Sequence, residues 1–434
     1  GAITTRGDHA HGILAQSIAG SGGAGGVEVS ATVALGGDGA GGGTADTVSV
    51  VQSGDISTAG YAAHGIIAQS IGGGGGASGS AIGTLSVGGS AAGSTGSQGG
   101  EVAVTNVGKI RTTSAGAVGI VAQSIGGGGG SGGDSKGIVG VGGAGAAGGA
   151  GGYVGVYDVG TIETSGKFSP GVLAQSIGGG GGNGGDTLVI SSLVTIAIGG
   201  SGAGGGDGGA VCLSSEGACQ DSRSNHVRDI STHGNYSPGI IAQNIGGGGG
   251  AGGSVTSVSG LSFLGLQIGG SGDGGGNAGT AGTVIDYSGL NIRTGGAHAT
   301  GILAQSIGGG GGNGGDASSY NASLGFNASL TMGGSGGSAI VFADAAERSG
   351  LSFSQFTAET QRRLSEVIPA IGSVQNPVDF TAGYIAGGNA PKFAAAVGAV
   401  LDDPVLARTL VVLTSDHGES LGEHGEPDHG LFLY

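Results

Sequence analysis

The sequence has no tryptophan, one methionine, two cysteines and only seven prolines. Charged residues make up 10% of the chain, and 29 acidic residues against 13 Lys and Arg give a formal net charge of −16. Because an acidic surface disfavours nucleic acids and anionic membranes, we expect neither as a partner. No apolar run approaches the roughly 18 residues of a transmembrane helix, so we expect no membrane-spanning segment.

Glycine takes the place of these scarce residues, at 114 of 434 positions. Such a content without an overall G-X-Y period excludes collagen and is typical of low-complexity chains. Between the glycines, however, Val, Ile and Ala recur with a period of two, in an order that is repeated along the chain. This order predicts a folded, repetitive structure.

One phrase occurs six times. Its second copy reads GIIAQSIGGGGG from Gly65 to Gly76. Successive copies are 53, 54, 52, 68 and 62 residues apart, counted from the alanine of the A-Q-S or A-Q-N core: Ala15, Ala68, Ala122, Ala174, Ala242 and Ala304. A period of this length, with insertions in two copies only, is typical of a stacked solenoid.

Each copy contains a short strand around an Ile and a Thr, a turn, and a second strand such as Gly65–Ile71. Since apolar residues lie on both sides of this second strand, we expect it to be covered on both faces. A variable strand follows the glycine run, and another leads into the next copy. We therefore predict an all-β fold, a parallel β-solenoid of six glycine-rich repeats of about 53 residues over residues 1–337.

Stacking places equivalent side chains above one another. A ladder of amide hydrogen bonds is then expected along the glutamines of the six phrases: Gln16, Gln69, Gln123, Gln175, Gln243 and Gln305. Glycine would permit positive φ at the corners and close approach of backbones. A competing fold, a bundle of polyproline II helices built from the glycine runs, is disfavoured because the five-residue runs are short and the strand pattern is regular.

The two cysteines, Cys212 and Cys219, lie in the extra residues of the fourth repeat. Their spacing suits a small disulfide loop in an oxidising compartment, which we predict; the alternative is two unrelated thiols on an inserted loop. The histidines near the turns are interpreted as single, solvated turn residues: His9, His11, His64, His226, His233 and His298.

The repeated phrase I-x-T…G-I-x-A-Q-S resembles the glycine-rich passenger repeats of bacterial autotransporters and related surface proteins. The resemblance covers residues 1–337. It implies secretion, exposure on the bacterial outer-membrane surface and a right-handed parallel β-solenoid with a structural or adhesive role. Because the first residues already lie inside a repeat, we expect the chain to begin within a larger protein.

A different pattern starts near residue 338. Apolar residues at helical spacing lead up to Pro369, and the segments GGSAIVFADAAERSGL and NPVDFT are similar to the acyl-CoA synthetase family that resembles succinyl-CoA ligase. We assign residues 338–407 to this α/β fragment. The phosphorylated-histidine loop, the CoA-binding part and the ATP-grasp part of that family are missing, from which we predict no ligase activity.

The last segment, residues 408–434, has a buried strand that runs directly into Ser-Asp-His-Gly-Glu. It resembles the metal-binding segment of sulfatases and alkaline-phosphatase-like hydrolases. The resemblance implies that Asp416 and His417 are metal ligands, for calcium or zinc. The acidic pair and the nucleophile of that family are missing, which predicts no ester hydrolysis.

Three partial resemblances indicate a fusion of fragments, with a short, incomplete α/β appendage that is partly disordered or loosely packed on the last coil. The leading hypothesis is a structural or adhesive β-solenoid, cell-surface or secreted, that is not an enzyme and has no cofactor. Two alternatives remain. One is a metal-dependent, sulfatase-like hydrolase that uses Asp416 and His417, and the other is self-association into filaments through uncapped solenoid ends.

Overall fold

The computed structural model describes residues 1–91, 93, 95–158, 160–191, 194–214, 228–259, 264–274, 283–285, 290–321 and 328–337. In this part of the chain every element is a β-strand and every strand pair between coils is parallel, which confirms the predicted parallel β-solenoid. These residues form no helix, and so none that is long and apolar enough to cross a membrane. The predicted appendage over residues 338–434 lies outside them.

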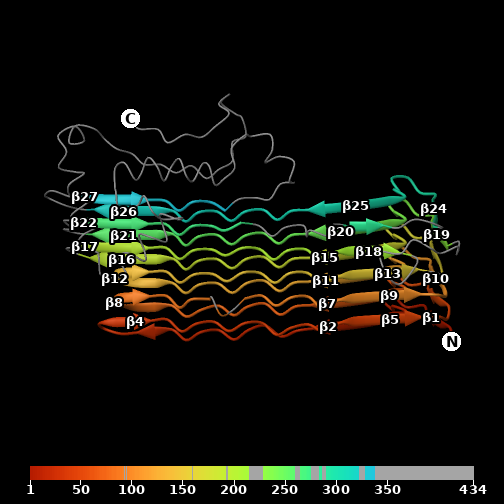
Figure 1. Ribbon diagram of the computed structural model, residues 1–434, viewed down its shortest axis with the longest axis horizontal. Helices are drawn as coiled ribbons and strands as arrows, with labels where there is room; N and C mark the ends of the chain where they lie inside the picture. The colour runs from red at the N-terminus through yellow and green to blue at the C-terminus, as the bar shows by residue number, and fades with distance from the viewer. Residues whose placement is uncertain are drawn as a thin grey trace, which may run out of the picture.

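Each repeat forms one coil, and the coils stack along the vertical direction of Figure 1. A coil is long and narrow. At one end of the coil three strands surround a core, a part that we call the head. Two extended glycine-rich segments, the arm, lead to a second strand region at the far end, the tip.

Three sheets form the head. Sheet A contains β1 (Ile3–Thr5), β6 (Ile56–Thr58), β10 (Lys109–Thr112), β14 (Thr161–Thr164), β19 (Arg228–Thr232) and β24 (Leu290–Thr294). Sheet B contains β2 (Ile13–Ile18), β7 (Ile66–Ile71), β11 (Ile120–Ile125), β15 (Val172–Ile177), β20 (Ile240–Ile245) and β25 (Ile302–Ile307). Sheet D contains β5 (Val48–Gln52), β9 (Val102–Asn106), β13 (Val154–Asp158), β18 (Val211–Ser214) and β23 (Thr283–Ile285).

Sheet C forms the tip. Its strands are β3 (Glu28–Val29), β4 (Val33–Leu35), β8 (Ala81–Val87), β12 (Ser135–Val141), β16 (Thr187–Ser191), β17 (Val194–Ile198), β21 (Val255–Ser259), β22 (Leu264–Ile268), β26 (Ala317–Asn321) and β27 (Ala328–Met332). Val189 and Val255 pack against Ala197 and Ala317 between its two layers. Small interior side chains therefore let the two layers lie close together.

The core of the head is built from the inward residues of sheets A, B and D. In the second coil Val48, Ile56, Ile66 and Ala68 are all buried in one cluster. In the strands β7 and β15 of sheet B the inward residues are buried. The outward glutamine and the outward isoleucine at the end of each strand are only half-buried. The expectation that this strand is covered on both faces is therefore wrong, because no second layer packs on its outer face within the described residues.

The arm is held by backbone hydrogen bonds in two directions. Gly126, Gly129 and Gly132 donate to Ile177, Gly180 and Asn183 of the next coil, each at 2.8 Å. The neighbouring residues donate across the arm to its other segment, as Gly127 does to Ser97 at 2.8 Å and Gly133 to Gly89 at 2.9 Å. No side chain lies between the two layers at these positions.

This pattern repeats every three residues, which is the period of polyproline II and not of a β-strand. The third position of this period donates neither to the next coil nor across the arm, and it faces outward. Gly128, Ser131 and Asp134 occupy this position. The polyproline II arrangement that the sequence analysis disfavoured is therefore present in the arm. Short glycine runs are sufficient to form this arrangement because each segment makes hydrogen bonds to two neighbouring coils and to the opposite layer.

Close approach, and not positive φ, explains the glycines of the arm. An added Cβ on Gly127 would lie 2.1 Å from the carbonyl oxygen of Gly73, whereas on Gly128 it would lie 3.7 Å from that of Gly180. Among the described glycines only Gly116 has a positive φ, at 70°. The expectation that glycine serves positive φ at the corners holds for Gly116 and is wrong for the other five coils, whose corner residues with positive φ carry side chains.

We predict that Gly127→Ala destabilises the chain by about 3 kcal/mol, because the methyl group would push two hydrogen-bonded layers apart. The matched control is Gly128→Ala in the same run, which should change stability by no more than about 1 kcal/mol. Urea unfolding followed by circular dichroism measures both. Equal losses in the two variants would contradict the close packing of the arm.

Candidate functional site

The outer face of sheet B carries the predicted glutamines, and the structure brings all six together. Each Nε2 donates to the Oε1 of the next glutamine, at distances of 2.5–2.6 Å along the whole ladder. The ladder runs through Gln16, Gln69, Gln123, Gln175, Gln243 and Gln305. Gln16 is exposed, and the other five are half-buried by their neighbours.

The corner between sheets A and B is a second recurrent feature. A buried threonine closes it: Thr58 Oγ1 donates to the Ala63 carbonyl at 2.5 Å and Thr112 Oγ1 to the Ala117 carbonyl at 2.6 Å. Thr5, Thr164 and Thr232 repeat the same contact. The hydroxyl thus satisfies a carbonyl that the turn would otherwise leave without a partner.

At the apex of this corner the backbone is left-handed in all six coils. The residues are His9, Ala62, Gly116, Phe168, Tyr236 and His298, with φ between 48° and 70°. Only one is glycine, so five positions carry strain of roughly 1–2 kcal/mol each. Strain retained at an exposed position indicates a role for the side chain. All six residues lie six positions before the alanine of the A-Q-S or A-Q-N core, a regular spacing from which the sequence alone did not predict this backbone conformation.

Aromatic rings stack at this apex. The ring centroids of Phe168 and Tyr236 are 5.2 Å apart, and those of Tyr236 and His298 are 4.9 Å apart, with interplanar angles of 22° and 12°. The Lys167 ammonium lies 4.7 Å from the Phe168 centroid. Phe168 is 54% exposed and Tyr236 45%. The apex therefore presents an aromatic strip to solvent.

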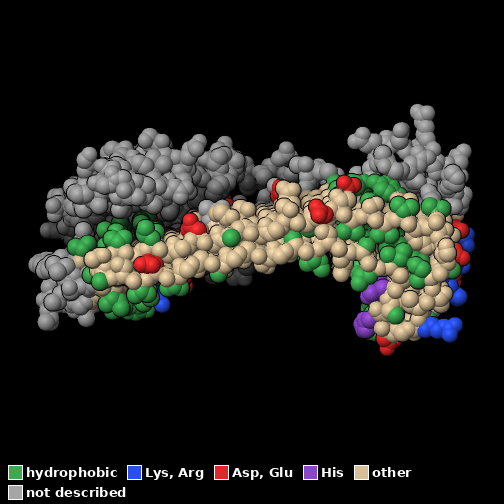
Figure 2. Space-filling model, turned by 90° about the horizontal axis from the view of Figure 1, so that it is seen from below, with side chains coloured by type: hydrophobic (Ala, Val, Ile, Leu, Met, Phe, Trp, Pro, Cys, Tyr) green, Lys and Arg blue, Asp and Glu red, His purple; other side chains and the backbone are tan. Residues whose placement is uncertain are grey.

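His11 and His64 lie next to the apex and are not independent turn residues. Their rings stack at 5.0 Å, the His64 backbone N–H donates to His11 Nδ1 at 3.2 Å, and the Val118 N–H donates to His64 Nδ1 at 3.0 Å. Because both Nδ1 atoms accept, the neutral rings carry their proton on Nε2. Figure 2, which looks along the stack, shows histidines gathered on one side of the head.

Burial is the main cause of a lowered pKa in both rings. It lowers the pKa of His64 to about 4, with smaller contributions from His11 and His9. Burial and then His9 also lower the pKa of His11. Protonation would place a proton on the atom that accepts a backbone N–H, so acid disfavours this arrangement.

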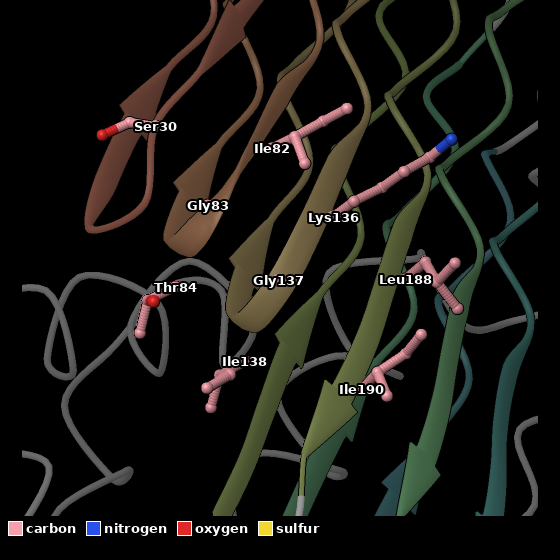
Figure 3. A pocket seen from close by; sticks show the side chains of 9 residues that line it. All are labelled: Ser30, Ile82, Gly83, Thr84, Lys136, Gly137, Ile138, Leu188 and Ile190. Carbon is pink, nitrogen blue, oxygen red and sulfur yellow. The ribbon is translucent and has the colours of Figure 1, made fainter.

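The tip has a shallow apolar groove of about 430 Å³. Figure 3 shows Ile82 on β8, and Leu188 and Ile190 on β16. Lys136, the charged side chain among those labelled, lies on β12 between these two strands. In the described part of the chain no group of three His, Cys, Asp or Glu side chains is placed to hold a metal ion. The aliphatic side chains of the groove thus offer apolar contact.

The remaining predicted site residues lie wholly or partly outside the described residues. Cys212 is buried in β18, but Cys219 lies outside the described residues, so their disulfide stays a prediction. Asp416 and His417 also lie outside them, as does His226. The metal ligation that the sulfatase resemblance implies therefore stays a prediction.

Comparison with known proteins gives one match. The family model of the Ligase-CoA domain matches residues 329–416, which are 88 of the 434 residues. This supports the acyl-CoA synthetase-like fragment, and the match begins within β27. No curated protein matches the chain, and neither does any solved structure.

The prediction that the chain is not an enzyme is contradicted by this match, which points, over a small part of the chain, to a CoA-ligase-related enzyme family. The prediction rested on parts of the ligase that this sequence lacks. Such parts can be contributed by other segments or chains, so their absence here does not exclude a catalytic role for the segment that is present.

We predict that Gln175→Met lowers the free energy of unfolding by about 1–2 kcal/mol, because it removes the ladder bonds to Gln123 and Gln243 while keeping the side-chain length. Gln16→Met, at the exposed end with one ladder bond, should cost less. Urea midpoints of the two variants provide the comparison. A larger loss for Gln16→Met would contradict a stabilising ladder.

A pH dependence follows from His64. Its pKa is near 6.5 in the unfolded chain and about 4 in the fold, so its contribution is fully present above pH 6.5 and is lost as pH falls towards 4. His64→Asn keeps an acceptor near Val118 but does not titrate. Between pH 7 and pH 4.5 the urea midpoint of the wild type should fall further than that of the variant. Equal falls would show that His64 does not sense acid.

Proposed function

We propose that residues 1–337 form a structural or adhesive β-solenoid of the autotransporter-passenger kind, exposed on a bacterial surface or secreted, and that it carries the CoA-ligase-related segment. The observation that supports this role most is the unbroken stack of six coils in register. A solenoid of this kind offers a long, regular surface on which recognition residues recur at the strand spacing.

Two surface features favour adhesion. The exposed aromatic strip at the apex is held by strained backbone, and large apolar side chains are exposed at the tip, among them Ile190 at 63% and Tyr320 at 64%. Exposed apolar and aromatic groups of this kind mark contact surfaces. The shallow groove and the few charges suit broad contact with another surface.

The proposal includes self-association through the ends of the stack. Leu14 and Ile18 of the first coil are 55% and 63% exposed, whereas the equivalent Ile67 of the second coil is 9% exposed. Wherever a stack of this kind ends without a cap, its end coil offers both apolar side chains and an open strand edge to another coil.

Surface exposure and adhesion can be tested together. An antibody against residues 1–337 should label intact cells that naturally produce the protein, without permeabilisation. Beads coated with the wild type or with Gly128→Ala should be retained on cell layers under flow, and beads coated with Gly127→Ala should be retained less, because that variant disturbs the arm. Labelling only after permeabilisation, or retention no better than that of albumin-coated beads, would contradict the proposal.

A further inference from the structure

The outer face of sheet B is uncharged over its whole length. On each strand the outward residues are an aliphatic side chain, a glutamine and an isoleucine, so two aliphatic columns flank the glutamine ladder. The first column is Leu14, Ile67, Val121, Leu173, Ile241 and Leu303, and the second is Ile18, Ile71, Ile125, Ile177, Ile245 and Ile307. Val118 packs beside Ile67 and Val121 and covers only part of the first column.

This face is constant from coil to coil, although it points outward. The equivalent outward positions of sheet A vary in size and charge from coil to coil: Thr4, Ser57, Arg111, Glu163, Ser231 and Arg293. On sheet A, outward side chains of neighbouring strands form local ion pairs, such as Lys109–Glu163 at 3.2 Å. Outward residues of a solvated sheet tolerate such variety. The ladder explains why the glutamines are constant, whereas the uniformity of the two aliphatic columns indicates a contact beyond the stack itself.

We propose that the outer face of sheet B pairs side by side with the same face of a second copy of this chain. Such a face is self-complementary under a two-fold axis. When two copies meet, each aliphatic column can contact an aliphatic column of the other copy, and the two glutamine ladders lie between the columns. Uncharged faces with stacked amides and aliphatic side chains are those that interdigitate in dry sheet-to-sheet interfaces. This contact is separate from association through the ends of the stack.

The size and the charge of the face are sufficient for such a pair. Six strands at about 4.8 Å and six residues at about 3.3 Å give about 570 Å² per copy, or about 1,100 Å² in total, just above the lower limit of a specific interface. No charged group is buried by the contact. The net charge of −16 on each copy opposes association from a distance, so salt should strengthen the pair.

Sedimentation velocity of the full chain, from low to high micromolar concentration, tests the inference. We expect a species of two chains as the first step of association, and this dimer to strengthen between 50 and 300 mM NaCl. Ile241→Lys places a charge in the middle of the face on both copies and should raise the dissociation constant by about 30-fold or more.

The matched control is Ser231→Lys, an outward substitution in the same coil but on sheet A, which should leave the dissociation constant within about twofold of the wild type. Circular dichroism confirms that both variants fold. A wild type that stays monomeric, or a dimer unaffected by Ile241→Lys, would overturn the pairing. Association past two chains that Ile241→Lys does not weaken would also overturn it, because end-to-end stacking does not use this face.

Discussion

The whole structure depends on two layers of backbone that lie close enough to donate hydrogen bonds to each other directly. In the arm this contact leaves no space for a Cβ at two of every three positions, as the distances at Gly126 and Gly127 show. Glycine loses more conformational entropy on folding than any other residue. The stacked coils offset that cost because each new coil adds two sets of hydrogen bonds to layers that are already ordered.

The head and the arm therefore have different kinds of interior. The head is an ordinary core, in which Val, Ile and Ala from three sheets are removed from water. The arm buries backbone against backbone and contains almost no side chain. Ser70, Ser124 and Ser176 connect the two, since each hydroxyl accepts from a glycine N–H at the head end of the arm and donates to a carbonyl there. The ladder and the corner threonine then fix the register of the head.

The sequence predicted the head well because period-two alternation and the repeated glutamine are local signals that stacking only extends. It did not predict the arm, because the run from Gly126 to Gly130 hides its own three-residue period, which shows only at Ser131 and Asp134. Positive φ is usually adopted by glycine, so residue preferences alone do not predict it at Phe168 and Tyr236. The family match over residues 329–416 shows in turn that parts missing from a sequence are weak evidence against an enzyme.

Residue-resolved amide hydrogen exchange in the arm is the most direct measurement of this account. The amides of Gly126, Gly127, Gly129 and Gly132 donate to neighbouring layers and should exchange slowly. Those of Gly128 and Ser131 donate to no acceptor in the part of the chain that the structure describes, and they should exchange quickly. A fast amide at every third position is the predicted result. Uniform protection, uniform exposure or a period of two through this run would contradict it.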